Sequence, residues 1–350
     1  MHHPISLHLR WLAAALALAL ECSGAIAREK IDVIVVGNGD RMTGEIVALS
    51  HGQLSLKTDY MGTVMIEWLD IVSIQSSQGF VVEDVHGDIY FGAMRSEAER
   101  GPLTIGSSEG NPQRIELANI ARITPSEKTL WSRLQGSLSV GFDYAKASDI
   151  TTLSGAFSTT YRGPEVIWSF DVDVNSTKDP AQGTLDRDKA SFGYRWLRPE
   201  GKFWFGVSSL ERNEETGVEA RLLLGGGLGR YLVQTSRSEF SALLGAAATQ
   251  EWATGEEGGQ ANLEGLVGAD WRIFDFSTPK VSLSATGVYY PSMTESGRYR
   301  TTLNLSLRRE IISDFYVDVS FYQSYDNQPP DVSAEKSDYG VTTSLGYSFY

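Results

Sequence analysis

The chain contains 350 residues with a formal net charge of −14, and its mean hydropathy is −0.19. An acidic balance of this size argues against nucleic acid as a partner, because nucleic-acid-binding proteins present basic surface. After residue 27 no apolar stretch is long enough to cross a bilayer as a helix. If the chain crosses a membrane, it must therefore do so as a closed barrel of strands.

The first residues have the organisation of a secretory signal peptide. Arg10 supplies a positive charge, residues 11–20 form an apolar run too short to span a bilayer, and residues 25–27 (Ala-Ile-Ala) form a small-x-small cleavage site. We predict a signal peptide at residues 1–27 and a mature chain that begins at Arg28.

The single cysteine, Cys22, lies inside this segment. A lipoprotein cysteine is the alternative interpretation, but Glu21 stands where such a signal needs a small residue. If cleavage follows Ala27, the mature chain has no thiol, so neither a disulfide nor cysteine chemistry is expected.

Residues 28–128 contain an internal repeat. The Gly-Asp-x-x-x-Gly segment at 39–44 returns at 87–92, 48 residues further on, and the segment 64–74 matches 113–123 at an offset of 49. Self-similarity at a fixed period indicates that one structural unit is built twice.

One such unit is small for an independent core, so two are expected to pack together. We predict repeats at about 28–78 and about 79–128, each a small SH3-like or Sm-like β-barrel of short strands and Gly-Asp turns. Asp40 and Asp88 could act as ligands, but residues that cap a hairpin turn are the simpler interpretation.

Residues 129–350 repeat one pattern about a dozen times: a short apolar and polar alternation that ends in a turn. In the clearest copy, Val166 and Trp168 would lie on one face of a strand and Ser169 and Asp171 on the other. Behind an export signal, this pattern predicts an all-β fold. A C-terminal antiparallel transmembrane β-barrel of about 12 strands would follow the tandem, with lipid outside and a polar lumen inside.

The alternation also assigns side chains to the two faces of the barrel wall. In the fifth strand it places Phe203, Phe205 and Val207 outward, whereas the facing of the sixth, at 219–233, is ambiguous. The charged residues predicted to face the lumen are Asp143, Asp171, Asp173, Arg195, Glu264, Asp270, Arg272, Arg308 and Asp318.

The connections between strands tend to alternate in length. Those after even-numbered strands are tight, whereas most after odd-numbered strands are longer: 175–187, 252–260, 292–298 and 326–338. Outer-membrane barrels have short periplasmic turns and longer outer loops, so both barrel ends and the N-terminal tandem are placed in the periplasm. A soluble β-sandwich predicts no such alternation.

Aromatic residues near predicted strand ends fit the girdles at the two membrane interfaces. They are Tyr144, Tyr161, Trp196, Phe203, Trp252, Tyr289, Tyr290 and Tyr347. The C-terminal segment resembles the strand signal read by the barrel-assembly machinery, with Phe349 in phase with the outward residues and Tyr350 one residue beyond.

The Gly-Asp-x-x-x-Gly tandem, followed by a small barrel that ends in aromatic residues, resembles the salt-induced outer-membrane protein family, also catalogued as domain of unknown function 481. The resemblance implies an outer-membrane location and a link to stress. It supplies no catalytic residues. The expected partners are outer-membrane lipid, lipopolysaccharide, the barrel-assembly machinery, and a periplasmic protein or the cell wall.

Three classes of function remain open. The first, an outer-membrane enzyme with a Ser-His site on the barrel, is excluded because no histidine follows His86, although chemistry without histidine is a remote alternative. The second is a narrow small-solute channel, and the third is a closed barrel that anchors the periplasmic tandem. We expect a non-catalytic protein with no cofactor and no metal site.

Overall fold

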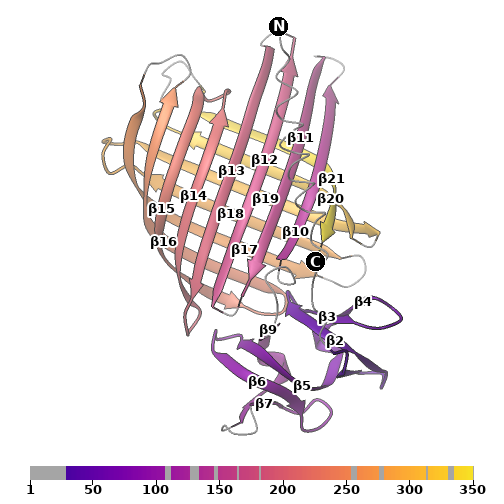
Figure 1. Ribbon diagram of the computed structural model, residues 1–350. Coiled ribbons are helices and arrows are strands. Elements are labelled where there is room, and N and C mark those ends of the chain that lie inside the picture. Colours follow the sequence, from indigo (N-terminus) through magenta and orange to yellow (C-terminus); the bar gives the residue numbers. More distant parts are fainter. Residues whose placement is uncertain are drawn as a thin grey trace.

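The computed structural model places the chain in two parts, an N-terminal sheet and a C-terminal barrel (Figure 1). It describes residues 29–106, 112–126, 134–145, 149–163, 165–180, 183–253, 258–275, 280–312, 314–329 and 335–349. The predicted signal peptide and the boundary predicted after residue 128 lie outside the described residues, so both stay predictions.

The N-terminal part is a nine-stranded sheet in the order β4-β3-β2-β1-β5-β6-β7-β8, with β9 paired to β2 and β5. Its strands are β1 (Asp32–Val36), β2 (Arg41–Ser50), β3 (Gln53–Lys57), β4 (Thr63–Glu67), β5 (Ile71–Asp84), β6 (Ile89–Ser96), β7 (Leu103–Gly106), β8 (Gln113–Ile115) and β9 (Ile120–Pro125).

The two sequence repeats occupy equivalent places in this sheet. Each contains a short 3₁₀ turn at the same point, η1 (Trp68–Asp70) in the first and η2 (Leu117–Asn119) in the second. The Trp68 Nε1 donates a hydrogen bond to the carbonyl of Leu117, its counterpart 49 residues on, over 2.8 Å. Strand β5 runs through both repeats, so the two share one sheet, and separate SH3-like or Sm-like barrels are not confirmed.

Both repeats contribute to one hydrophobic core. Its fully buried side chains come from strands far apart in the chain, which explains why neither repeat closes a core alone. They include Ile34, Ile46, Leu54, Phe80, Met94, Leu103 and Ile123.

The repeated glycine of the Gly-Asp-x-x-x-Gly motif is needed because neighbouring backbone approaches it closely. A Cβ at Gly44 would lie 2.7 Å from the carbonyl oxygen of Lys57, and one at Gly92 would lie 2.5 Å from the carbonyl carbon of Gly106. Asp40 and Asp88 also play matching parts, since their carbonyls accept hydrogen bonds from Val36 and Asp84 across equivalent turns. Both aspartates therefore serve as turn residues.

The C-terminal part is a closed antiparallel barrel of twelve strands, β10 to β21, in which β21 pairs back to β10. The predicted fold class is therefore confirmed. The strands are β10 (Leu134–Ala145), β11 (Ile150–Arg162), β12 (Val166–Asp179), β13 (Gly183–Leu197), β14 (Lys202–Asn213), β15 (Val218–Gln234), β16 (Ser238–Ala253), β17 (Gln260–Asp275), β18 (Val281–Pro291), β19 (Tyr299–Ile312), β20 (Phe315–Asp326) and β21 (Ser337–Phe349).

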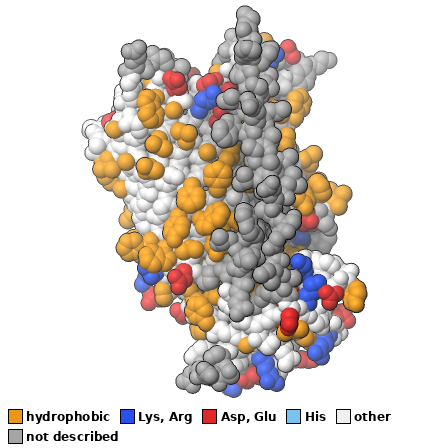
Figure 2. Space-filling model, viewed as in Figure 1, with side chains coloured by type: hydrophobic (Ala, Val, Ile, Leu, Met, Phe, Trp, Pro, Cys, Tyr) orange, Lys and Arg blue, Asp and Glu red, His pale blue; other side chains and the backbone are white. Residues whose placement is uncertain are grey.

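The outer wall of the barrel is apolar. Large hydrophobic side chains are exposed along it, among them Phe142, Phe192, Leu244, Val267, Val341 and Leu345. Figure 2 shows them spread over the barrel wall, with charged side chains gathered toward the N-terminal domain and the opposite rim. This is the arrangement of an outer-membrane-type β-barrel. Within the described residues, no helix combines the length and apolar character needed to span a membrane.

The facing predicted for the fifth strand is wrong. In β14, Phe203 is fully buried and Phe205 packs against buried core residues, whereas Trp204 and Leu210 are exposed on the outside. The run Phe203-Trp204-Phe205 is apolar at every position, so local alternation could not choose a face. The Phe203 girdle assignment fails for the same reason.

Two further expectations change. Tyr290, predicted for a girdle, packs against a buried cluster inside the barrel, whereas its neighbour Tyr289 is exposed on the outside. Most of the long connection predicted at 175–187 is strand, because β12 continues to Asp179 and β13 begins at Gly183. The polar residues of this hairpin pair with each other instead of forming a loop.

Candidate functional site

The lumen of the barrel is the candidate site, because the charged side chains converge there. We call the end that meets the N-terminal domain the domain end and the opposite end the far end. In Figure 1 the N-terminal domain lies beneath the barrel. The turn between β15 and β16 marks the domain end, because Gln234 bonds Glu83 of the domain.

Buried ion pairs fill the far end. Arg298 lies 2.6 Å from Glu251 and 2.7 Å from Asp326 between the closest nitrogen and oxygen atoms, and its side chain is only 2% exposed. Arg300 and Glu264 form a bidentate pair at 2.6 and 2.8 Å. We call this group the far-end cluster, and its members are Glu211, Arg221, Glu251, Glu264, Arg298, Arg300 and Asp326.

Some of these contacts cross the lumen. Arg221 on β15 lies 3.8 Å from Asp326 on β20, although the two strands are five places apart in the ring. The amide of Asn213 on β14 donates to Asp338 on β21 over 3.0 Å, again between strands five places apart. Direct contacts between opposite walls therefore bridge the lumen at this level.

A carboxyl pair lies at the rim of the far end. Glu215, in the connection between β14 and β15, lies close to Asp338. The Nε of Arg187 lies 3.8 Å from a carboxylate oxygen of the same aspartate. Burial of the Glu215 carboxyl, reinforced by the negative charge of Asp338, raises the pKa of Glu215 to about 7.

An apolar layer lies deeper in the lumen, on strands β14 to β18. Leu223, Ala247 and Leu266 are buried there, and Phe205, Leu243, Val288 and Tyr290 pack against them. The sequence predicted a polar lumen, so this layer is a correction. Its members sit at inward positions of strands whose outward positions are also apolar, and such strands show no clear alternation.

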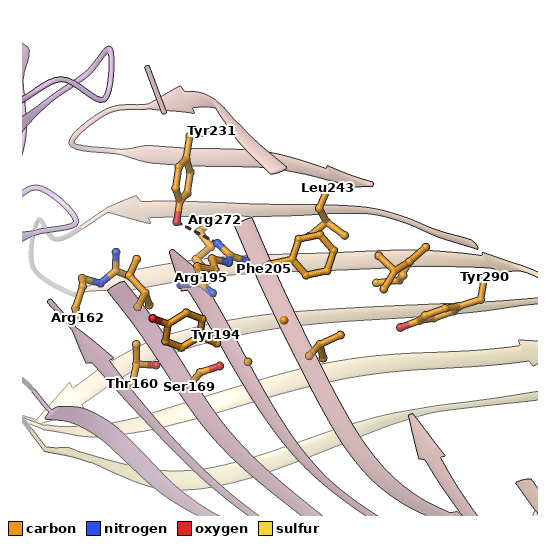
Figure 3. Close-up of a pocket in the computed structure, with 16 residues that line it drawn as sticks. Thr160, Arg162, Ser169, Tyr194, Arg195, Phe205, Tyr231, Leu243, Arg272 and Tyr290 are labelled. Carbon is orange, nitrogen blue, oxygen red and sulfur yellow. Dashed lines mark hydrogen bonds between the residues drawn. The ribbon is translucent and has the colours of Figure 1, made fainter. Parts of the chain in front are cut away.

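Polar cavities occupy the domain-end half of the lumen. One of about 440 Å³ is lined by serine and threonine hydroxyls and by Arg162, Arg272 and Arg308. A second, of about 200 Å³, adjoins the apolar layer, and Figure 3 shows Arg162, Arg195 and Arg272 around it with Thr160 and Ser169. Both cavities are lined by Arg162 and Arg272, so they meet at these side chains.

Most of the predicted lumen charges are found in these groups. Arg195 and Arg272 share the carboxylate of Asp270, at 3.2 and 3.4 Å. Arg308 lies 3.9 Å from Asp318, and its guanidinium lies over the ring of Tyr316. Glu264 belongs to the far-end cluster, Asp171 accepts a hydrogen bond from Ser158, Asp173 follows on the same face of β12, and the side chain of Asp143 lies outside the described residues.

The N-terminal domain is held to the barrel by a buried charged group. Arg122 of β9 donates to Glu83 over 2.7 Å within the domain and to Glu239 over 3.0 Å on the barrel. Gln234 of β15 completes the link by donating to Glu83 over 2.8 Å. The two carboxylates raise the pKa of Arg122 against the effect of burial, so the residue stays charged.

A histidine completes this interface. The ring of His51 stacks on Phe274 of β17 with 4.1 Å between centroids, and its Nε2 is buried without a hydrogen-bond partner among the described residues. Burial lowers the pKa of His51 to about 3, so the ring is neutral at pH 7.

Two glycine turns let the backbones of the two parts approach closely. A Cβ at Gly52 would lie 2.3 Å from the carbonyl oxygen of Ser236, and one at Gly87 would lie 2.3 Å from the amide nitrogen of Gly201. Both glycines have positive φ, at 79° and 82°. Gly52 and Gly87 therefore belong to the interface as well as to their turns.

Sequence reasoning missed the interface and most of the far-end cluster. The cluster members that were not predicted lie near strand ends. Opposite charges at inward positions of these strand ends could have indicated them. The absence of histidine after His86 does not keep histidine away from the barrel. His51 of the N-terminal domain lines the 440 Å³ cavity together with serines. Its Nε2 bonds none of those serines.

Within the described residues, no group of three or more His, Cys, Asp or Glu side chains is placed to hold a metal ion. The chain was compared with known proteins. The model of a family described as "Protein of unknown function, DUF481" matches residues 138–349, which is nearly the whole barrel. The chain belongs to the DUF481 family. The predicted membership is therefore confirmed.

No curated protein matches this DUF481 chain. Among solved structures, it is similar to the NanC porin with 9% identity and a TM-score of 0.37, covering 62% of this chain and 99% of that one. It is similar to the translocator domain of the autotransporter NalP from Neisseria meningitidis with 12% identity and a TM-score of 0.34, covering 61% and 87%. It is also similar to a bacterial polysaccharide outer membrane secretin with 8% identity and a TM-score of 0.34, covering 62% and 98%. These likenesses are too slight to carry an argument about function.

Proposed function

We propose that this protein is a non-catalytic outer-membrane barrel with a closed lumen that holds its N-terminal domain against the periplasmic mouth. The apolar outer wall suits contact with lipid and lipopolysaccharide, and the domain then lies in the periplasm, where a protein or the cell wall could bind it. The observation that carries the proposal is the set of contacts between opposite walls, above all Arg221 with Asp326 and Asn213 with Asp338.

The way the lumen is closed favours a fixed structure over an open pore. A charge removed from water is costly unless it is well paired, and the far-end cluster pairs its charges at short range. Opening it would expose several arginines and carboxylates and break these contacts together. The domain interface adds a buried link at the other end through Arg122.

A narrow solute channel is the second candidate. The observation that favours it is the 440 Å³ polar cavity, which is only partly enclosed. A channel would need a continuous path beyond this cavity, through the apolar layer and the far-end cluster. A link to salt stress stays a prediction from the family resemblance alone.

The anchoring role is tested by reversing the charge at the interface. The variant Arg122→Glu places a third carboxylate beside Glu83 and Glu239, so we expect amide hydrogen exchange in the His51–Gly52 turn to rise at least tenfold. Adding Glu239→Arg should restore part of the protection. Unboiled samples should still migrate differently from boiled ones, which shows that the barrel is folded.

Arg114→Glu is the matched control, because Arg114 pairs with Glu97 on the exposed surface of the same domain. It should leave exchange in the His51–Gly52 turn unchanged. If Arg122→Glu also leaves that exchange unchanged, the domain is not held by this link and the anchoring proposal fails.

A further inference from the structure

Arg162, at the domain-end cavities, lies near the carboxylate of Glu239 but keeps one nitrogen without a hydrogen bond among the described residues. Its Nη1 is buried and has no hydrogen-bond partner among the described residues. The neighbouring Arg195 and Arg272 each bond Asp270, and Arg122 bonds Glu83 and Glu239. A buried donor without a partner costs free energy, which an acceptor from outside the chain would recover by bonding this nitrogen.

The surroundings of Arg162 supply further donors. Arg162, Arg272, Thr160 and Ser169 all line both cavities, so they meet at the junction of the two (Figure 3). Guanidinium groups bind phosphate or carboxylate oxygens through parallel hydrogen bonds, and hydroxyls can add single bonds. The junction therefore offers two cationic groups and two hydroxyls to one small acceptor.

We propose that this junction is a binding site for a small soluble oxyanion, a phosphate or carboxylate group carried by a polar solute. The 440 Å³ cavity has room for the rest of such a solute, and its serine and threonine lining suits hydroxyl groups. The cavity lies inside the barrel wall and is only partly enclosed, so the anion comes from water and not from a lipid headgroup. The site does not depend on whether the far end is closed.

Asp171, Glu310 and Asp314 all line the larger cavity, so three carboxylates oppose the anion there. Asp171 lines the larger cavity, and its carboxylate is held by a hydrogen bond of 2.7 Å from Ser158. A bound anion would be repelled by this carboxylate, which limits its affinity. Removing the charge of Asp171 should therefore strengthen anion binding, whereas removing the charge of Arg162 should weaken it.

The test is calorimetric titration of the folded full-length protein in zwitterionic detergent with sodium phosphate, and separately with sodium acetate. Sodium chloride at matched ionic strength is the reference. We expect saturable binding of at least one of the two oxyanions, about tenfold or more weaker in Arg162→Gln, because a hydrogen bond to a charged group is lost. Asp171→Asn should bind more tightly than the wild type.

Arg309→Gln is the matched control, since Arg309 is the exposed neighbour of the cavity-lining Arg308 in β19. It removes the same charge and should bind as the wild type does. If boiled and unboiled samples of Arg162→Gln migrate alike, the variant is not folded. Thr160→Val then takes its place and should weaken binding several-fold. The proposal is overturned if neither oxyanion binds above the chloride reference, or if the variants at positions 160 and 162 bind as tightly as the wild type.

Discussion

Arg298 shows at the scale of one residue how the far end is held together. Its guanidinium bonds three carboxylates, which belong to Glu251 on β16, Asp326 on β20 and Glu295 in the connection before β19. Removing one partner of a buried ion pair leaves the other charge desolvated, which costs far more than the loss of a surface pair.

We expect Arg298→Ala to lower the free energy of unfolding of the barrel by about 3–5 kcal/mol. Urea unfolding in detergent, followed by the change in migration of unboiled samples, measures this effect. Arg309→Ala removes an exposed arginine and should cost less than about 1 kcal/mol. Equal losses in the two variants would show that the far-end cluster does not stabilise the barrel.

His51 makes docking of the N-terminal domain depend on pH. The folded-state pKa of His51 is about 3, below its ordinary value of 6.5. A histidine with a lowered pKa contributes stability that is complete above pH 6.5 and is lost as the pH falls toward 3, because the undocked ring takes up a proton more readily. The charged groups that act on this ring are Glu239, Arg162, Arg272 and Arg122.

Protection of the His51–Gly52 turn against hydrogen exchange, corrected for the intrinsic rate at each pH, should therefore fall between pH 7.5 and pH 5. The variant His51→Asn should remove most of this dependence, because asparagine does not titrate and tolerates the positive φ of this position. Protection that stays constant with pH in the wild type would contradict the burial of a neutral ring.

At the scale of elements, the paired glycines of the N-terminal repeat fix how closely two strands approach. Gly44 and Gly92 occupy equivalent positions, and each has backbone of the next strand where a Cβ would be. The reason for the repeated motif is therefore steric, and it applies to β2 against β3 and to β6 against β7.

Gly44→Ala should destabilise the N-terminal domain by about 1–3 kcal/mol, because the strand must shift to admit the methyl group. Hydrogen exchange of the amides of β2 measures the loss. Gly37→Ala is the control, since the nearest atom to its Cβ would lie at 3.6 Å, an ordinary contact. If the two variants exchange alike, close strand approach does not explain the motif.

The limits of sequence reasoning also appear at this scale. Alternation identified most of the barrel strands, because a strand with lipid on one side and polar groups on the other must alternate. It failed in β14, where Phe203, Trp204 and Phe205 follow one another and both faces are apolar. The repeat was visible, but its folding into one sheet was not, because pairing of β9 with both β2 and β5 joins distant segments.

The candidate site was less predictable than the strands. Inward charges such as Arg195, Glu264 and Asp270 follow from parity along a strand. Their partners do not, because Arg195 reaches Asp270 across strands that are four places apart in the ring. No local sequence pattern indicates that His51 stacks on Phe274, because this contact joins a turn of the N-terminal domain to a strand end of the barrel.

At the scale of the whole molecule, three layers lie along the lumen. A partly enclosed polar cavity lies nearest the N-terminal domain, the apolar layer follows on β14 to β18, and the far-end cluster lies last. The domain is held across the first opening by Arg122, His51 and the close turns at Gly52 and Gly87. Such an assembly is suited to holding a domain at a membrane more than to passing solutes.

Electrical conductance across a planar lipid bilayer is the measurement that tests this account most directly. Full-length protein, shown to be folded by the different migration of boiled and unboiled samples, is inserted and recorded in concentrated potassium chloride. We predict no stable conductance steps, because opposite walls of the barrel touch at the far end. Regular, reproducible steps from the wild-type protein would contradict the closed lumen and establish the channel instead.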